Sequence, residues 1–120
     1  MKRLFKKSLT KTDIGKRMAV PTKCLKSLPQ FRGGREIDFQ AEDARGQLWS
    51  FVCSIRWETR YKKPVLSKGW RRFVIAKGLQ VGDMVAFYKR GAGASSGARF
   101  KIKVTREVKV FGAVFGYSKL

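Results

Sequence analysis

The stretch LWSFVCSI, residues Leu48–Ile55, places an apolar side chain at every second position from Trp49 onward, which is the repeat of a β-strand with one buried face. A second alternating stretch, Glu36–Gln40, precedes it, and turn-forming residues at Asp43–Gly46 separate the two. We therefore expect a β-hairpin that contributes one face to the hydrophobic core. Cys53 is in phase with the apolar positions, so we expect its thiol to be buried as packing.

The next stretch, RWETRYKKP at Arg56–Pro64, contains four cationic and two aromatic residues. It lies between the alternating strand and an apolar-faced helical run, which predicts an outward-facing loop on a rigid base. Cationic and aromatic side chains together suit a polyanion with flat, stackable parts. This composition favours nucleic acid over a small substrate.

The run from Trp70 to Leu79 has the pattern of a short amphipathic helix, with Trp70, Phe73 and Val74 three and four residues apart. Gly78 is placed to end this helix, and Ser67 is placed to cap its first turn. Pro64–Leu66 is expected to be a short strand before it. Trp49 and Trp70 are both in phase with core positions, which makes them structural.

The rest of the chain is rich in short β-forming runs separated by turn signals. The expected elements are an edge strand at Arg3–Leu9, a polar loop at Thr10–Arg17, a short strand at Met18–Pro21, a helix of about two turns from Thr22 to Leu28 before Pro29, a strand at Met84–Tyr88 after the turn Val81–Asp83, a connector at Gly91–Gly97, and strands at Phe100–Val104 and Val108–Phe115. About seven strands with two short helices indicate a small β-barrel or sandwich. The basic residues of Arg3–Leu9 have a second reading as a short nuclear-import signal.

The chain has 120 residues, of which 28 are Lys or Arg and 8 are Asp or Glu, for a net charge of +20. This length predicts one domain, 1–117, with a tail at 118–120. A folded domain that is basic along its whole length indicates an anionic partner. No run is long and apolar enough to cross a bilayer, and MKRLFKK lacks the apolar core of a signal peptide, so we expect a soluble intracellular protein.

Enzymatic and metal-binding functions have little support in the sequence. There is no histidine to act as a general base, and Cys24 and Cys53 alone are too few for a zinc site. Four acids between Glu36 and Asp43 allow a divalent site in principle, although alternate strand residues face solvent by default. We therefore expect a protein that is not an enzyme and has neither a cofactor nor a small-molecule substrate.

The order of motifs resembles the plant B3 DNA-binding domain found in several groups of transcription factors. The matching segments are LFKKSLTKTDIGKRMAVP (Leu4–Pro21), GQLWSF (Gly46–Phe51), PVLSKGWRRFV (Pro64–Val74), KGLQVGDMVAF (Lys77–Phe87) and VKVFG (Val108–Gly112). The resemblance implies a seven-stranded open β-barrel with two short helices, which binds double-stranded DNA in the nucleus. It also implies that two loops, here Lys11–Met18 and Arg56–Lys63, grip the major groove, and that Lys68 and Arg71 approach phosphates.

Two departures from the family pattern fall in these reading elements. Fewer residues separate Asp13-Ile14-Gly15-Lys16 from Val20-Pro21 than is common in the family, and the second loop is longer than its commonest form. The resemblance therefore implies the family's mode of DNA binding for this chain, but it does not indicate which base sequence is bound.

The candidate DNA-binding residues come from the two loops and from the start of the helical run. They are Lys11, Thr12, Lys16, Arg17, Met18, Arg56, Trp57, Glu58, Thr59, Arg60, Tyr61, Lys62, Lys63, Lys68 and Arg71. The arginines of the loops have a planar guanidinium group that can donate two hydrogen bonds to guanine O6 and N7, whereas the lysines suit phosphate contacts. Thr12 and Thr59 are candidate donors to phosphate or base. Trp57 and Tyr61 either pack on sugars or form an auxiliary cluster, and Glu58 either accepts from cytosine or orders a nearby arginine.

Two other functions remain open from the residues alone. Small basic barrels also bind RNA by stacking, which allows an RNA-binding or ribosome-associated protein. The apolar run Val108–Tyr117 and the basic surface also allow a module that docks an acidic protein partner. The identity of any protein partner is not specified by the sequence.

Overall fold

The computed structural model describes residues 2–27, 35–58, 61–90, 99–110 and 113–120. The elements are β1 Lys2–Ser8, α1 Lys11–Gly15, β2 Met18–Ala19, the 3₁₀-helix η1 Thr22–Ser27, β3 Glu36–Glu42, β4 Leu48–Glu58, β5 Tyr61–Lys68, α2 Trp70–Lys77, β6 Met84–Lys89, β7 Phe100–Val110 and β8 Ala113–Lys119. The expected connector Gly91–Gly97, and Leu28 and Pro29 after η1, lie outside the described residues.

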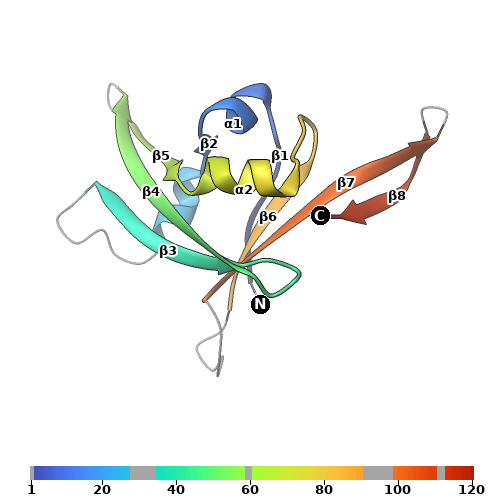
Figure 1. The fold of residues 1–120 in the computed structure, drawn as a ribbon. Helices are drawn as coiled ribbons and strands as arrows, with labels where there is room; N and C mark the ends of the chain where they lie inside the picture. Colours follow the sequence, from blue (N-terminus) through green and yellow to red (C-terminus); the bar gives the residue numbers. More distant parts are fainter. Residues whose placement is uncertain (1, 28–34, 59–60, 91–98, 111–112) are drawn as a thin grey trace.

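The strands form one curved sheet in the order β1-β6-β7-β3-β4-β5-β2, and β8 pairs with β7 beside this path. Neighbouring strands are antiparallel except for β3 and β7, which run parallel where Ala41 and Glu42 meet Phe100 and Lys101. The sheet curls into a half-barrel, and α2 lies across the space between its two walls (Figure 1). The expected open β-barrel is confirmed, but its described part has eight strands where seven were expected, and α1 is present in addition to the two expected helices at η1 and α2.

The core is built from the alternating faces that the sequence indicates. Phe51, Cys53, Trp70 and Phe73 are each at most 1% exposed, and Trp49 is 9% exposed. The Phe73 ring stacks on Trp70 at 5.7 Å between ring centres and meets the edge of Trp49 at 5.1 Å. Thus α2 is fixed against β4 by aromatic contacts, and the structural roles expected for Trp49, Trp70 and Cys53 are confirmed.

The sequence predicted an outward-facing loop for the basic stretch Arg56–Pro64. In the structure this stretch belongs instead to the β-hairpin of β4 and β5. β4 continues to Glu58, β5 begins at Tyr61, and the cross-strand pairs include Arg56 with Lys63 and Glu58 with Tyr61. Backbone pairing between the two strands carries the hairpin beyond the apolar run. The alternation of side chains ends at Ile55, so it did not reveal this extension.

Two local predictions near the helices are corrected by the structure. The polar stretch after β1 contains the short helix α1, because Thr10 and Asp13 form a capping box in which each side chain accepts from the backbone N–H of the other. Ser67 does not cap α2: it lies in β5, and its hydroxyl is 2.6 Å from that of Ser54. The N-cap of α2 is Gly69, with a positive φ of 81°.

The C-terminal region forms a second long hairpin, in which β8 folds back along β7. Residues 118–120, expected as a tail, are ordered: Ser118 and Lys119 lie in β8, and the Leu120 N–H donates to the Val104 carbonyl at 2.9 Å. Leu120 also packs against the core. Residues 118–120 therefore lie against the barrel.

Candidate nucleic-acid interface

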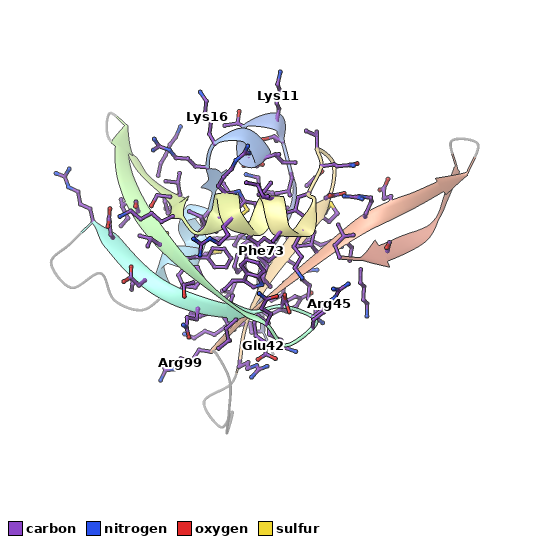
Figure 2. The ribbon with its side chains drawn as sticks, in the orientation of Figure 1. Lys11, Lys16, Glu42, Arg45, Phe73 and Arg99 are labelled. Atoms are coloured by element: carbon purple, nitrogen blue, oxygen red, sulfur yellow. The ribbon has the colours of Figure 1, made fainter. Side chains whose placement is uncertain are left out.

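Helix α1 projects the cations of the first predicted loop from one end of the barrel. Its capping box closes the N-terminal turn, and the Lys16 N–H donates to the Thr12 carbonyl at 2.9 Å. Lys11, Thr12, Lys16 and Arg17 are exposed. Lys11 and Lys16 point away from the molecular body beside α1 (Figure 2). These four predicted site residues are thus available to a ligand.

The hairpin β4–β5 places the second predicted element at the same end of the molecule as α1 (Figure 1). Strand β2 ties the two elements together, because Met18 and Ala19 pair with Leu66 and Val65 of β5. The Val20 N–H also donates to the Pro64 carbonyl at 2.9 Å. The chain that leaves α1 therefore runs as an edge strand along the hairpin.

An open depression lies between these two elements and brings their cations together. It is lined by Lys7, Thr10, Thr12, Asp13, Lys16, Arg17, Ala19, Lys63 and Val65. Among these, Lys16 and Arg17 come from the first predicted loop and Lys63 from the second. Residues far apart in the sequence thus converge on one concave surface that carries four cationic side chains.

Most of the remaining predicted residues lie away from the depression or have no described side chain. Lys68 is exposed at the end of β5 opposite the hairpin tip, so it is not gathered with Lys63. Arg71 is exposed on α2, and its Nη1 donates to the Ile14 carbonyl at 2.6 Å. Thr59 and Arg60 lie outside the described residues, and for Arg56, Trp57, Glu58, Tyr61 and Lys62 the structure describes the backbone path alone.

The prediction that Met18 contacts DNA is wrong for its side chain. Met18 is 0% exposed and belongs to the hydrophobic core. The pairing of β2 with β5 turns this side chain inward, whereas Ala19 next to it is exposed. Met18 therefore anchors the end of the first element instead of contacting a ligand.

Asp13 is the acidic residue that lines the depression, and its charge is neutralised locally. Its carboxylate accepts from Lys7 Nζ at 2.8 Å, from the Thr10 N–H at 2.8 Å and from the Thr10 hydroxyl at 2.9 Å. Burial by itself would raise the pKa of Asp13, but these hydrogen bonds outweigh it and hold the pKa below its ordinary value. Because Lys7 offsets the charge of Asp13, the depression keeps a positive character from Lys16 and Arg17.

Two of the four acids between Glu36 and Asp43 are used in ion pairs. Glu42 accepts from Arg90 at 2.9 Å, and Asp43 lies 2.8 Å from Lys77 Nζ. Within the described part of the chain, no group of three metal-binding side chains converges. Likewise, no helix in these described ranges is long and apolar enough to span a membrane.

Lys7 and Thr10 line the depression but were absent from the residues predicted from sequence. The sequence pattern predicts only that Lys7 lies in a cationic edge strand, and its contact with Asp13 depends on how β1 meets α1. The Thr10-to-Asp13 spacing of a capping box was the signal that could have indicated the helix. No sequence signal pointed to Lys7.

The chain matches a known protein family. The family model described as the B3 DNA binding domain matches residues 5–107, which is most of the chain. The chain belongs to the B3 DNA-binding domain family. The matched range runs from Phe5 in β1 to Glu107 in β7.

Relatives of this B3 domain include plant proteins with B3 domains in their names. The B3 domain-containing transcription factor NGA4 of Arabidopsis thaliana is 37% identical over 91 residues, which cover 72% of this chain and 26% of NGA4. The AP2/ERF and B3 domain-containing transcription factor RAV1 of the same plant is 36% identical over 90 residues, which cover 70% of this chain and 26% of RAV1. The chain spans only about a quarter of the length of these two relatives.

Solved structures show the same fold. A complex of Arabidopsis FUS3 with DNA superposes with a TM-score of 0.72 at 26% identity, covering 86% of this chain and 96% of the FUS3 chain. A complex of Arabidopsis thaliana LEC2 with DNA gives a TM-score of 0.71 at 23% identity, covering 86% of this chain and 92% of that chain. The second likeness supports the fold alone.

Proposed function

We propose that this B3 domain binds double-stranded DNA in a sequence-specific manner, as the DNA-binding module of a nuclear transcriptional regulator, and that it has no catalytic role. The observation that carries the proposal is the depression that joins Lys16 and Arg17 to Lys63. The NGA4 and RAV1 relatives are transcription factors by name, and the FUS3 relative is solved in complex with DNA. These similarities support DNA as the anionic partner of the domain.

The division of roles follows from the chemistry of the cations. Arg17 is exposed at the end of the first element, where its planar guanidinium suits a bidentate contact with a guanine in the major groove. Lys11, Lys16 and Lys63 are exposed point charges that suit phosphates and set the register of the domain on the duplex. Arg56, Arg60 and Lys62 would extend the same division to the hairpin.

Selection of bound sites from a random pool of DNA duplexes tests the proposal most directly. We expect one short motif to be enriched, and we expect its affinity to exceed that of a scrambled duplex by about a thousandfold or more at physiological salt. Equal affinity for the selected and scrambled duplexes would contradict sequence-specific binding. Stronger competition by single-stranded RNA than by the selected duplex would favour an RNA-binding function instead.

Substitutions in the depression test its role. Arg17→Ala should weaken binding to the selected duplex by about 1–3 kcal/mol and relax the preference at one base pair. Lys16→Ala should weaken all duplexes alike and reduce the slope of log affinity against log salt by about one. Arg99→Ala is the matched control, because Arg99 is exposed and lies at the opposite end of the molecule from Lys16 (Figure 2). A loss with Arg99→Ala equal to that with Arg17→Ala would place the interface elsewhere.

A further inference from the structure

Helix α1 is too short to be stable by itself, and side chains of α2 donate hydrogen bonds to two of its carbonyl groups. A helix leaves its last four carbonyls without partners in its own backbone, and a helix of five residues is far below the length that persists alone in water. Trp70 Nε1 donates to the Asp13 carbonyl at 2.7 Å, and Arg71 Nη1 donates to the Ile14 carbonyl at 2.6 Å. Two neighbouring residues of α2 therefore satisfy two neighbouring carbonyls of α1.

The other side of α1 is held by β1. Lys7 Nζ reaches the Asp13 carboxylate at 2.8 Å, and the same carboxylate closes the capping box with Thr10. Helix α1 is thus clamped between β1 and α2. The exposed cations Lys16 and Arg17 follow directly after this clamped segment.

The two donors from α2 differ in burial, so replacing one would affect folding and replacing the other would affect only the position of α1. Trp70 is 1% exposed and belongs to the core, so its removal would disturb the whole domain. Arg71 is exposed, and its described hydrogen bond is the one to Ile14. Loss of the Arg71 side chain would leave the aromatic core intact and release one point of the clamp.

We propose that Arg71 is a positioning residue: its guanidinium holds the Ile14 carbonyl and so fixes where Lys16 and Arg17 meet the ligand. This inference rests on the proposed function and assigns Arg71 a different role from the phosphate contact that the resemblance to the B3 family implies. A side chain that contacts phosphate contributes equally to every duplex. A side chain that aims a base-reading element contributes to the preferred duplex above others, because a small displacement of Arg17 breaks a bidentate contact.

The test compares Arg71→Ala with Arg72→Ala, which removes the same charge from the next residue of the same helix. Arg72 is also exposed, but it points about 100° further around α2. With Arg71→Ala we expect the affinity for the selected duplex to fall about three- to tenfold, the loss expected for one hydrogen bond. We expect affinity for a scrambled duplex to stay within about twofold, with an unchanged salt slope. Arg72→Ala should leave the ratio of selected to scrambled affinity unchanged.

A second readout needs no DNA. Hydrogen exchange of the Ile14 and Lys16 amides, which donate to the Thr10 and Thr12 carbonyls, reports the opening of α1 in the free protein. Arg71→Ala should raise the exchange rates of both amides about three- to tenfold and leave the strand amides of β4 unchanged, whereas Arg72→Ala should change neither.

Equal losses of affinity for both duplexes with a salt slope lower by about one would overturn the inference in favour of a phosphate contact. Unchanged exchange of both amides would overturn it as well. If the wild-type domain prefers no duplex, the proposed function fails, and the exchange rates still decide whether Arg71 holds α1.

Discussion

Three carboxylates, those of Asp13, Asp43 and Asp83, are buried among the described residues of this strongly cationic chain. Each accepts from a backbone N–H of its own turn: Thr10 for Asp13, Arg45 and Gln47 for Asp43, and Gln80 for Asp83. Each also pairs with one cation, Lys7, Lys77 or Arg106 respectively. The three acids therefore join a local turn to a distant element.

The free energy of unfolding should depend on pH through the ionisation of Asp43. Burial would raise its pKa, but hydrogen bonds from Lys77, Trp49 and two backbone groups lower the pKa from the ordinary 3.8 to about 2. Because the pKa is lower in the folded state, ionised Asp43 contributes stability above about pH 4, and this contribution is lost as the pH falls toward 2. Asp43→Asn should therefore lower the free energy of unfolding by about 2 kcal/mol at pH 7, with the difference from wild type shrinking below pH 4.

Urea denaturation followed by circular dichroism between pH 7 and pH 2 measures this difference. Asp38→Asn is the control, since Asp38 is exposed on β3 and should change stability by less than about 0.5 kcal/mol at any pH. A difference for Asp43→Asn that stays constant down to pH 2 would show that the charge of Asp43 contributes nothing.

At the scale of elements, the joint between β5 and α2 depends on a close approach of two backbones. Gly69 has a φ of 81°, and a Cβ built on it would lie 2.0 Å from the Ser50 carbonyl oxygen of β4. The neighbour is backbone of a central strand, so it cannot move aside without disturbing the pairing of β3 with β4. Glycine is required here for both its conformation and its size.

Gly69→Ala should destabilise the domain by about 3 kcal/mol or more, because it adds an overlap with backbone to an unfavourable φ. Gly15→Ala is the matched control: nothing lies within 4 Å of the added Cβ, and we expect a change below about 1 kcal/mol. Thermal or urea unfolding measures both. A mild effect of Gly69→Ala, similar to that of Gly15→Ala, would mean that α2 and β4 are not held as closely as the structure places them.

At the scale of the whole molecule, the net charge of +20 is a source of self-repulsion. Asp13, Asp43 and Asp83 are enclosed in internal pairs with Lys7, Lys77 and Arg106, so these three acids do not offset the charge of the exposed cations. Free of an anionic partner, the folded domain therefore keeps like charges close together.

Raising the NaCl concentration from about 0.05 M to about 0.5 M should raise the midpoint of thermal unfolding, since the screening length falls to a few ångströms. The charge-reversing variant Arg99→Glu should show a smaller rise, because it lowers the net charge by two at an exposed position. Circular dichroism during heating measures both midpoints. A fall of the wild-type midpoint with salt would show that the ion pairs outweigh the repulsion.

The sequence determined the elements whose information is local. Alternation at Leu48–Ile55 identified the central hairpin, the spacing of Trp70, Phe73 and Val74 identified α2, and Gly78 marked its end, as the structure confirms. These patterns repeat within a few residues, so neighbouring positions report which face is buried. Composition identified the cationic stretch Arg56–Pro64, and the segments that resemble the B3 family paired it with a first cationic element at Lys11–Met18.

The tertiary structure alone decided how these elements meet. The burial of Met18 follows from pairing with Leu66, and the bond of Arg71 to Ile14 joins residues 57 positions apart. The extension of β4 and β5 into Arg56–Lys63 follows from pairing across the hairpin. Strand pairing and contacts between helices are made by backbone groups common to all residues, so side-chain patterns do not encode their partners. The depression between α1 and β5 exists only through these long-range contacts.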